Sequence, residues 1–234
     1  GGRALLNGTL DNSAATLTSP SGGPLELFGG RLSGGTVASG ALTFTTSGGY
    51  LDNTTLTGAV GVPASAYAYL NNSTTVTGGT VTFGSSSYFY LSGTGATLTF
   101  DSATTGTGDL RIYSDGSTGT AFQNQGNLTH TAASSGLLYA RELTNSGLLT
   151  VSSNSLQVGS TGTGYNTVNT ATGIMTATGS GSILYLDGNV DNNGTLAAAN
   201  SGQLRFRGTN VTANLGNIVL SGGGRALLNG TLDN

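Results

Sequence analysis

The sequence predicts an all-β fold, a parallel β-solenoid of about ten coils with about 22 residues in each coil. The segment GGRALLNGTLDN at position 1 returns letter for letter at position 223, so the chain repeats with a period of 222 residues. Within that period, apolar-x-apolar triplets followed by small or polar residues recur at intervals of 18 to 28 residues. Apolar and polar residues alternate inside the runs, and helical spacing is absent.

Four runs show the alternation most clearly. They are ALTFTT at 41–46, TVTF at 80–83, ATLTF at 96–100 and SGLLTV at 146–151. Each places Val, Leu or Phe at every second position, which is typical of a strand with one buried side. This pattern argues against the disorder that a chain rich in Gly, Ser and Thr with few charges would otherwise favour.

The recurring triplets predict which residues occupy equivalent inward positions in successive coils. The last inward residue of successive coils is placed at Leu6, Leu27, Leu51, Leu70, Leu91, Ile112, Ala140, Val158, Leu186, Phe206 and Leu228. Residues 1–222 therefore form one solenoid unit, and residues 223–234 begin the next identical unit. With about 4.8 Å between stacked strands, we expect Leu228 in the column of Leu6, about 48 Å along the rod.

Two of the intervals between triplets are long. They correspond to residues 114–136 and 159–182, which we expect to loop out from the rod. The only His, His130, and the only Met, Met175, lie in these stretches, so His130 is predicted to be a loop residue. Loops on a rigid scaffold frequently carry function.

Strand alternation also predicts a stripe of tyrosines and arginines that points outward on one side of the rod. It takes in eight of the nine tyrosines and six of the seven arginines. Its core residues are Tyr50, Tyr67, Tyr69, Tyr88, Tyr90, Arg111, Tyr113, Tyr139, Arg141, Tyr185, Arg205 and Arg207. Arg3, Glu26, Phe28, Gln157 and Arg225 extend the same column.

This stripe has two interpretations. Tyr and Arg are enriched at interfaces, so the stripe is a candidate surface for lateral contact between rods or for a glycan. Alternatively, tyrosines stacked coil upon coil stabilise the sheet by about 0.2 to 1 kcal/mol per neighbouring pair and bind nothing.

Composition excludes several classes of partner. Charged residues make up 7% of the chain, the net charge is −3, and Cys, Lys and Trp are absent. We therefore expect no nucleic-acid partner and no disulfide framework. No apolar run approaches the roughly 18 residues that a membrane span requires, so membrane insertion of this segment is not expected, and neither is a signal peptide within it.

Catalytic chemistry is not expected, and neither is a cofactor or a metal. There is no Cys or Lys nucleophile, and the single His has no acid beside it in the sequence. Carboxylate pairs of a polysaccharide-cleaving enzyme remain a remote alternative. The candidates are Asp101, Asp109 and Asp115, or Asp187 and Asp191. In a solenoid, aspartates more commonly stand at the corners, where they stabilise turns, than in catalytic pairs.

Two segments, ELTNSGLLTVSSNSLQV at 142–158 and NVDNNGTLAAANSGQLRFRG at 189–208, are similar in composition and pattern to a known kind of repeat. They resemble the β-helical repeat regions of large bacterial surface proteins, such as filamentous haemagglutinins and autotransporter passengers. The resemblance implies an extracellular fibre or stalk whose partners are further copies of the same repeat. The alternative that it implies is a cell-surface adhesin that binds a glycan or a host surface.

Overall fold

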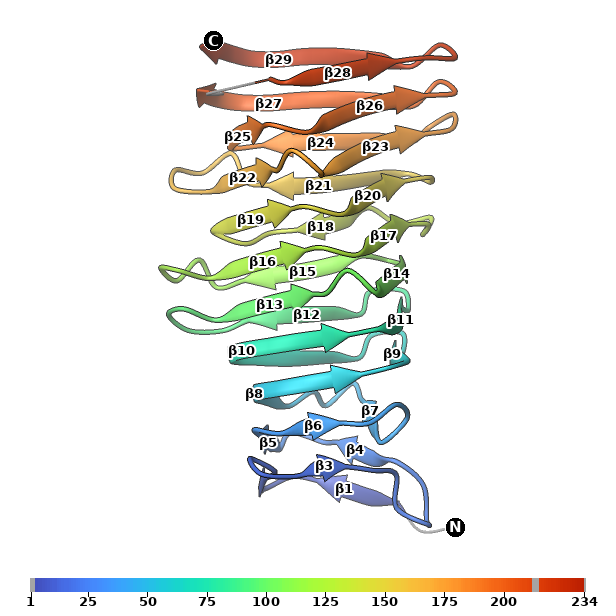
Figure 1. The fold of residues 1–234 in the computed structure, drawn as a ribbon, viewed down its shortest axis with the longest axis vertical. Coiled ribbons are helices and arrows are strands. Elements are labelled where there is room, and N and C mark those ends of the chain that lie inside the picture. Colours follow the sequence, from blue (N-terminus) through green and yellow to red (C-terminus); the bar gives the residue numbers. More distant parts are fainter. Residues whose placement is uncertain (1–2, 212–214, 234) are drawn as a thin grey trace.

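The computed structural model describes residues 3–211 and 215–233, and over these ranges the chain is a rod of stacked β-strands without helices (Figure 1). All strand pairings in these ranges are parallel, and the first and last strands lie at opposite ends of the rod. The predicted parallel β-solenoid is therefore confirmed. Residues 1–2, 212–214 and 234 of the two predicted units lie outside the described residues.

Each coil contributes strands to three faces, which we number one, two and three in the order in which the chain visits them from residue 9 onward. Face one contains β2 (Thr9–Asp11), β5 (Arg31–Ser33), β12 (Tyr88–Leu91), β15 (Arg111–Ser114), β18 (Gly136–Leu138), β21 (Ser155–Gly159) and β24 (Ile183–Asp187). Face two contains β3 (Thr16–Leu17), β6 (Thr36–Val37), β13 (Thr97–Phe100), β16 (Ala121–Asn124), β19 (Glu142–Asn145), β22 (Asn166–Asn169) and β25 (Asn189–Asn192). Four longer strands turn from face one into face two: β8 (Tyr50–Thr57), β10 (Tyr67–Thr77), β27 (Gln203–Val211) and β29 (Arg225–Asp233).

Face three has two parts. Its main sheet contains β9 (Val60–Val62), β11 (Gly79–Phe83), β14 (Thr104–Gly108), β17 (Asn127–His130), β20 (Leu148–Val151), β23 (Ile174–Thr178), β26 (Thr195–Ala199) and β28 (Asn217–Leu220). Towards the N-terminal end it continues as β1 (Ala4–Leu6), β4 (Leu25–Leu27) and β7 (Leu42–Phe44), with β7 packed against β9.

The corner between faces one and two depends on residues that accept a left-handed backbone. Asn53 and Asn72 stand at this corner inside β8 and β10, with φ of 50° and 52°. In a later coil Gly188 takes the same role with φ of 83°. Asn and Gly tolerate this conformation better than other residues, which lets a continuous strand change face without a loop.

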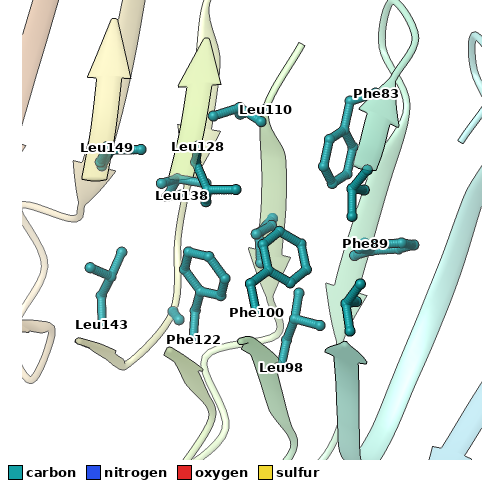
Figure 2. Close-up of a cluster of buried hydrophobic side chains, with 14 of the residues drawn as sticks. Phe83, Phe89, Leu98, Phe100, Leu110, Phe122, Leu128, Leu138, Leu143 and Leu149 are labelled. Atoms are coloured by element: carbon teal, nitrogen blue, oxygen red, sulfur yellow. The ribbon is translucent and has the colours of Figure 1, made fainter. Parts of the chain in front are cut away.

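The core is the inward side of all three faces. Phe89 and Phe100 of one coil and Phe122 of the next coil are 0–1% exposed, with Leu98 and Leu138 beside them (Figure 2). Burying each such side chain contributes roughly 1.5 to 3 kcal/mol, but only because the coils above and below supply the covering surface. A coil therefore depends on its neighbours for stability.

A column of buried asparagines replaces apolar side chains on face two in the C-terminal half of the rod. Asn124 Nδ2 donates to Asn145 Oδ1 (2.7 Å), and Asn145 Nδ2 to Asn169 Oδ1 (2.8 Å). Asn169 Nδ2 donates to Asn192 Oδ1 (2.7 Å), and all four side chains are 0–2% exposed. The ladder begins where Phe100 pairs with Asn124, which leaves the Asn124 Oδ1 atom without a partner.

The predicted inward column is confirmed in three separate stretches and wrong elsewhere. The pairs that agree with the prediction are Leu6–Leu27, Leu51–Leu70, Leu70–Leu91, Val158–Leu186, Leu186–Phe206 and Phe206–Leu228. Leu27 does not lie below Leu51, because it pairs with Phe44, while Leu51 pairs with Leu32. The short coil between them escaped the sequence count because its strands have only two or three residues.

A second slip occurs in the middle of the rod. Leu91 pairs with Ser114, whereas Ile112 pairs with Phe89 below it and with Leu138 above it. Leu138 in turn pairs with Val158, so Ala140 does not belong to that column. Both errors in this part of the rod are shifts of two residues, which preserve the inward direction and are therefore invisible in the alternation.

The two identical twelve-residue segments lie on different faces. In the first copy Leu6 belongs to β1 on face three, and β2 follows on face one. In the second copy Leu228 belongs to β29 on face one, and the strand continues into face two. The expectation that Leu228 stands in the column of Leu6 is therefore wrong, because the second copy is placed one face later than the first.

The long stretches do not loop out as a whole. Residues 114–136 contain β16 and β17, and residues 159–182 contain β22 and β23, so only the corners at 115–120 and 160–165 project (Figure 1). His130 is not a loop residue: it lies in β17 and is 0% exposed.

The imidazole fits because Gly136 has no side chain, since a Cβ there would lie 2.7 Å from His130 Nδ1. Met175, in β23, is likewise 0% exposed. The only His and the only Met of the chain are therefore core residues rather than exposed loop residues.

Candidate functional site: the outward side of face one

Eleven of the twelve core stripe residues lie on the outward side of face one, in two adjacent columns of half-buried side chains. One column contains Tyr50, Tyr69, Tyr90, Tyr113, Tyr139 and Arg207, and the other contains Tyr67, Tyr88, Arg111, Tyr185 and Arg205. Parallel pairing without slippage brings these residues together, because each strand stacks directly on the equivalent strand of the previous coil. Gln157 lies in the second column as expected, because it pairs with Tyr185. Arg225 does not, because it pairs with Gln203, while Leu227 pairs with Arg205.

Three predicted members of the extended column are not on this face. Arg3 precedes β1, and Glu26 and Phe28 belong to or follow β4, so all three lie on face three. There the guanidinium of Arg3 forms an ion pair with Glu26. The error has the same source as the column error, because the sequence count assigned β4 to the face that β5 occupies.

The structure adds Arg31, which the sequence analysis left out. Its guanidinium lies 4.8 Å from the ring centroid of Tyr50, and Nη1 lies 3.0 Å from Oδ2 of Asp52. The signal was present in the sequence, since Arg31 and Ser33 flank a buried Leu32.

Six of the tyrosines form a continuous tyrosine cluster, consisting of Tyr50, Tyr67, Tyr69, Tyr88, Tyr90 and Tyr113. Tyr67 and Tyr88 stack with centroids 5.1 Å apart and planes at 5°. Tyr50 and Tyr69 stack at the same distance with planes at 23°. Tyr69 meets Tyr90 edge to face at 5.4 Å, so the rings cover one another instead of presenting free faces.

The phenols of Tyr69 and Tyr88 resist ionisation. Burial first, and then the neighbouring tyrosines, raise the pKa of Tyr69 and of Tyr88 above the ordinary value. A negative charge is costly beside other electron-rich rings and away from water. The cluster therefore presents neutral hydroxyl groups and ring edges.

A hollow interrupts the cluster. Tyr69, Tyr88, Tyr90 and Tyr113 line a space of about 390 Å³ that is open to solvent. The edge-to-face packing of Tyr88 with Tyr113 (5.3 Å, 89°) leaves room that parallel stacking would close. Its walls offer aromatic surface and phenol hydroxyls without a charged group.

A second group occupies the same face near the C-terminal end. Arg207 pairs with the carboxylate of Asp187 through Nε (2.8 Å) and Nη2 (2.6 Å). Its guanidinium lies 3.8 Å from the ring centroid of Tyr185, and Arg205 Nη1 donates to the Tyr185 hydroxyl (3.3 Å). The hydrogen bond to Asp187 is the main reason why the pKa of Arg207 is raised. These arginines are therefore held by contacts within the rod.

Arg141 lies at the corner between faces one and two rather than in the columns. Its Nε donates to the Gly116 carbonyl (2.9 Å) and its Nη1 to the Thr163 carbonyl (3.0 Å), which joins the two projecting corners. Tyr165 packs against this guanidinium and donates to the Tyr139 hydroxyl. Burial and then this hydrogen bond raise the pKa of Tyr165 to about 12.

The aspartates considered for catalysis are engaged in holding the coils. Asp101 accepts from the Gly78 N–H (3.0 Å), and Asp115 accepts from the Gly93 N–H (2.7 Å). Asp187 is buried against Arg207, while Asp191 lies in β25 on face two. Asp187 and Asp191 thus belong to different faces.

One cluster contains the residue types of a hydrolase triad but connects them differently. Ser134 Oγ donates to Asp109 Oδ2 (2.8 Å), and that oxygen also pairs with Arg111 Nε (2.9 Å). His130 Nε2 donates to the Ser134 carbonyl oxygen (2.9 Å), and His130 Nδ1 accepts from the Leu110 N–H (3.3 Å). Both ring nitrogens are therefore bound to the backbone, and no hydrogen bond links the ring to the serine hydroxyl.

Within the described ranges, no group of three or more His, Cys, Asp or Glu side chains is arranged to hold a metal ion. Over residues 3–211 and 215–233, no helix has the length and apolar character needed to cross a bilayer. Comparison with known proteins finds no matching family, no matching curated protein and no matching solved structure. The architecture is consistent with a β-helical repeat, and none of these comparisons links the chain to filamentous haemagglutinins or autotransporter passengers.

Proposed function

We propose that this chain is a structural segment of an extracellular β-solenoid fibre or stalk that lengthens by the continuation of coil upon coil. The observation that carries the proposal is the parallel stacking of the coils, in which strands of face one pair with the equivalent strands of the coils below and above them (Figure 1). A solenoid built in this way lengthens by adding further coils of the same kind.

The sequence repeat supports the same function. A chain that returns to its first twelve residues after 222 residues is suited to a tandem array, in which each unit supplies the neighbour that the previous unit needs. Few charges and the absence of Cys and Lys suit a surface exposed outside the cell. Face one, with its neutral tyrosine cluster, offers a surface through which rods bundle side by side.

Electron microscopy of a chain that carries two 222-residue units tests the proposal. We expect one continuous rod that is about 48 Å longer than the rod of a single unit. Two separate globular bodies joined by a linker would refute it. Replacing Tyr67, Tyr69, Tyr88 and Tyr90 with Ser should reduce side-by-side association without shortening the rod.

A second candidate function, adhesion through a glycan, is favoured by the hollow in the tyrosine cluster. Its aromatic walls and neutral hydroxyls suit a sugar ring better than a charged ligand. Binding to immobilised polysaccharides would support this function if Tyr90→Ala abolished it and Tyr185→Ala, outside the hollow, did not. Equal binding by both variants would count against it.

A further inference from the structure

We propose that Tyr139 and Tyr165 are a site of oxidative modification, at which a peroxide oxidant joins the two phenol rings in a dityrosine cross-link. The new bond connects an ortho carbon of one ring to an ortho carbon of the other, so it fastens two successive coils to each other. This inference goes beyond the proposed function, because it assigns a covalent modification that does not depend on how rods lengthen or bundle.

Tyr139 and Tyr165 come from different coils and meet where face one turns into face two. Tyr139 directly follows β18, and Tyr165 directly precedes β22 at the end of the projecting corner 160–165. The hydroxyl of Tyr165 donates to the hydroxyl of Tyr139. The ring centroids lie 4.6 Å apart, and the ring planes are inclined by 41°. The two phenols therefore touch through the edges that carry their hydroxyl groups.

This contact already has the arrangement of the cross-linked product. In dityrosine the carbon–carbon bond lies next to both hydroxyl groups, so the two oxygens are neighbours and the rings are twisted against each other. Tyr139 and Tyr165 meet both conditions before any bond forms. Reacting groups that are held in the geometry of the product combine much faster than groups that must first find each other.

The pairs of the tyrosine cluster are less suited to the same bond. Tyr67 and Tyr88 have ring planes at 5°, so they present their faces to each other and not their hydroxyl edges. Tyr69 meets Tyr90 with planes at 74°, which points the edge of one ring at the face of the other. Within the described ranges, a hydrogen bond between two tyrosine hydroxyls occurs at the corner pair alone.

The surroundings hold both rings in this position. The guanidinium of Arg141 lies 5.2 Å from the ring centroid of Tyr165, and its Nη1 donates to the Gly164 carbonyl (3.2 Å). The Tyr165 carbonyl accepts from the N–H of Asn189 in the next coil (3.1 Å). Tyr165 is 8% exposed, whereas Tyr139 is half-buried on the outward side of the rod. An oxidant therefore reaches the pair through Tyr139, while Tyr165 stays in place.

The reaction balances with hydrogen peroxide as the oxidant. Each phenol gives up one electron and one proton, and the carbon–carbon bond forms between the ortho carbons of the two phenoxyl radicals. The hydrogens on those two carbons then move to the oxygens, which restores both aromatic rings and both hydroxyl groups. One peroxide molecule takes up the two electrons and two protons and is reduced to two molecules of water.

Tyrosine is the residue type through which this chain is suited to oxidative cross-linking. The chain has no Cys for a disulfide and no Lys for an amide cross-link. The two tyrosines are 26 residues apart in the sequence. A bond between them restricts the unfolded chain far more than the folded rod, so we expect it to stabilise the fold as a disulfide does.

Treatment of the folded chain with hydrogen peroxide and a peroxidase tests this proposal. We expect the blue fluorescence of dityrosine to appear. Trypsin cleaves after arginine, so it separates Tyr139 in the peptide 112–141 from Tyr165 in the peptide 142–205. Mass spectrometry should find these two peptides joined with the loss of two hydrogen atoms, and fragment ions should place the bond at the two tyrosines.

Tyrosine-to-phenylalanine variants identify the partners. Tyr139→Phe and Tyr165→Phe each keep the ring and remove one phenol, so either change should abolish the joined peptide. The matched controls are Tyr113→Phe and Tyr185→Phe, since these are the other tyrosines of the same two peptides, and both should leave its yield unchanged. A joined peptide that persists in Tyr165→Phe contradicts the proposal. So does an unmodified chain that forms dityrosine only at other positions or not at all.

Two further measurements separate a bond within one copy from a bond between copies. In a mixture of isotope-labelled and unlabelled chains, the joined peptides should carry one kind of label only, and a main product of mixed label would overturn the proposal. Oxidation should also shift the urea midpoint of the unmodified chain upward and leave that of Tyr165→Phe where it was. Equal shifts in the two chains would show that a different bond is responsible.

Discussion

The guanidinium of Arg207 holds the buried carboxylate of Asp187 in the coil below it. Two hydrogen bonds of 2.8 and 2.6 Å join them, and Asp187 is 1% exposed while the Arg207 side chain is 34% exposed. The pair fixes one coil on the next at the outward side of face one. Arginine on this surface is therefore part of the rod's construction as well as of its exterior.

Removing this arginine should destabilise the rod. Arg207→Ala leaves the Asp187 carboxylate buried without its partner, and we expect a loss of about 2 to 4 kcal/mol, discounted for the partial exposure of the arginine. The midpoint of urea unfolding measures it. Arg205→Ala is the control, since Arg205 binds Gln203 and Tyr185 but no carboxylate, and it should cost less than about 1 kcal/mol. Equal losses of stability in the two variants would contradict the conclusion that Arg207 stabilises the rod through the Asp187 carboxylate.

The asparagine ladder should be far more sensitive than the asparagines on the surface. Asn145→Ala leaves the Oδ1 atom of Asn169 without its donor and Nδ2 of Asn124 without that acceptor. At about 1 to 3 kcal/mol for each unsatisfied buried group, we expect a loss of roughly 2 to 5 kcal/mol. Asn189→Ala, which removes an exposed bond to Asn166, should change the unfolding midpoint little. A harmless Asn145→Ala would show that the ladder does not stabilise the rod.

Alkaline pH should weaken the corner that Tyr165 closes. Its pKa is raised to about 12 in the folded chain, against an ordinary value near 10. The folded state therefore keeps this proton when the unfolded state has lost it, so the stabilisation is complete below pH 10 and disappears between about pH 10 and 12. Absorbance of the tyrosinate ion should show a late step that Tyr165→Phe removes. If that step persists in the variant, another tyrosine is responsible.

Acidic pH should act through His130. Burial lowers the pKa of its imidazole below the ordinary value of 6.5. The unfolded chain takes up the proton first, so the stability present above pH 6.5 falls as the pH is lowered through that value. The chain has one His, so its ring protons give a single titration by nuclear magnetic resonance. A midpoint at or above 6.5 would disagree with the buried position in β17.

Local features of the sequence were sufficient for the architecture. Alternation in runs such as ATLTF at 96–100 identifies strands and their inward sides, because side-chain direction in a strand depends only on whether a position is odd or even. The spacing of the triplets then predicts stacking coils. For the same reason, most of the tyrosines were correctly expected to share one outward surface.

The positions within the coil needed the tertiary structure. Ile112 was assigned to the column of Leu91 and actually pairs with Phe89, because a shift of two residues leaves the alternation unchanged. The burial of His130 depends on Gly136 in another coil, and the asparagine ladder depends on four coils in register. None of these relations leaves a local sign in the sequence.

The identical terminal segments show most directly what the sequence alone does not determine. The residues ALL form β1 on face three in one copy and lie in the face-one part of β29 in the other. The sequence determined that these residues form a strand with alternate side chains inward, which is a property of the segment alone. Only the tertiary structure decided which face the strand joins, because that choice depends on the edge that the neighbouring coil presents.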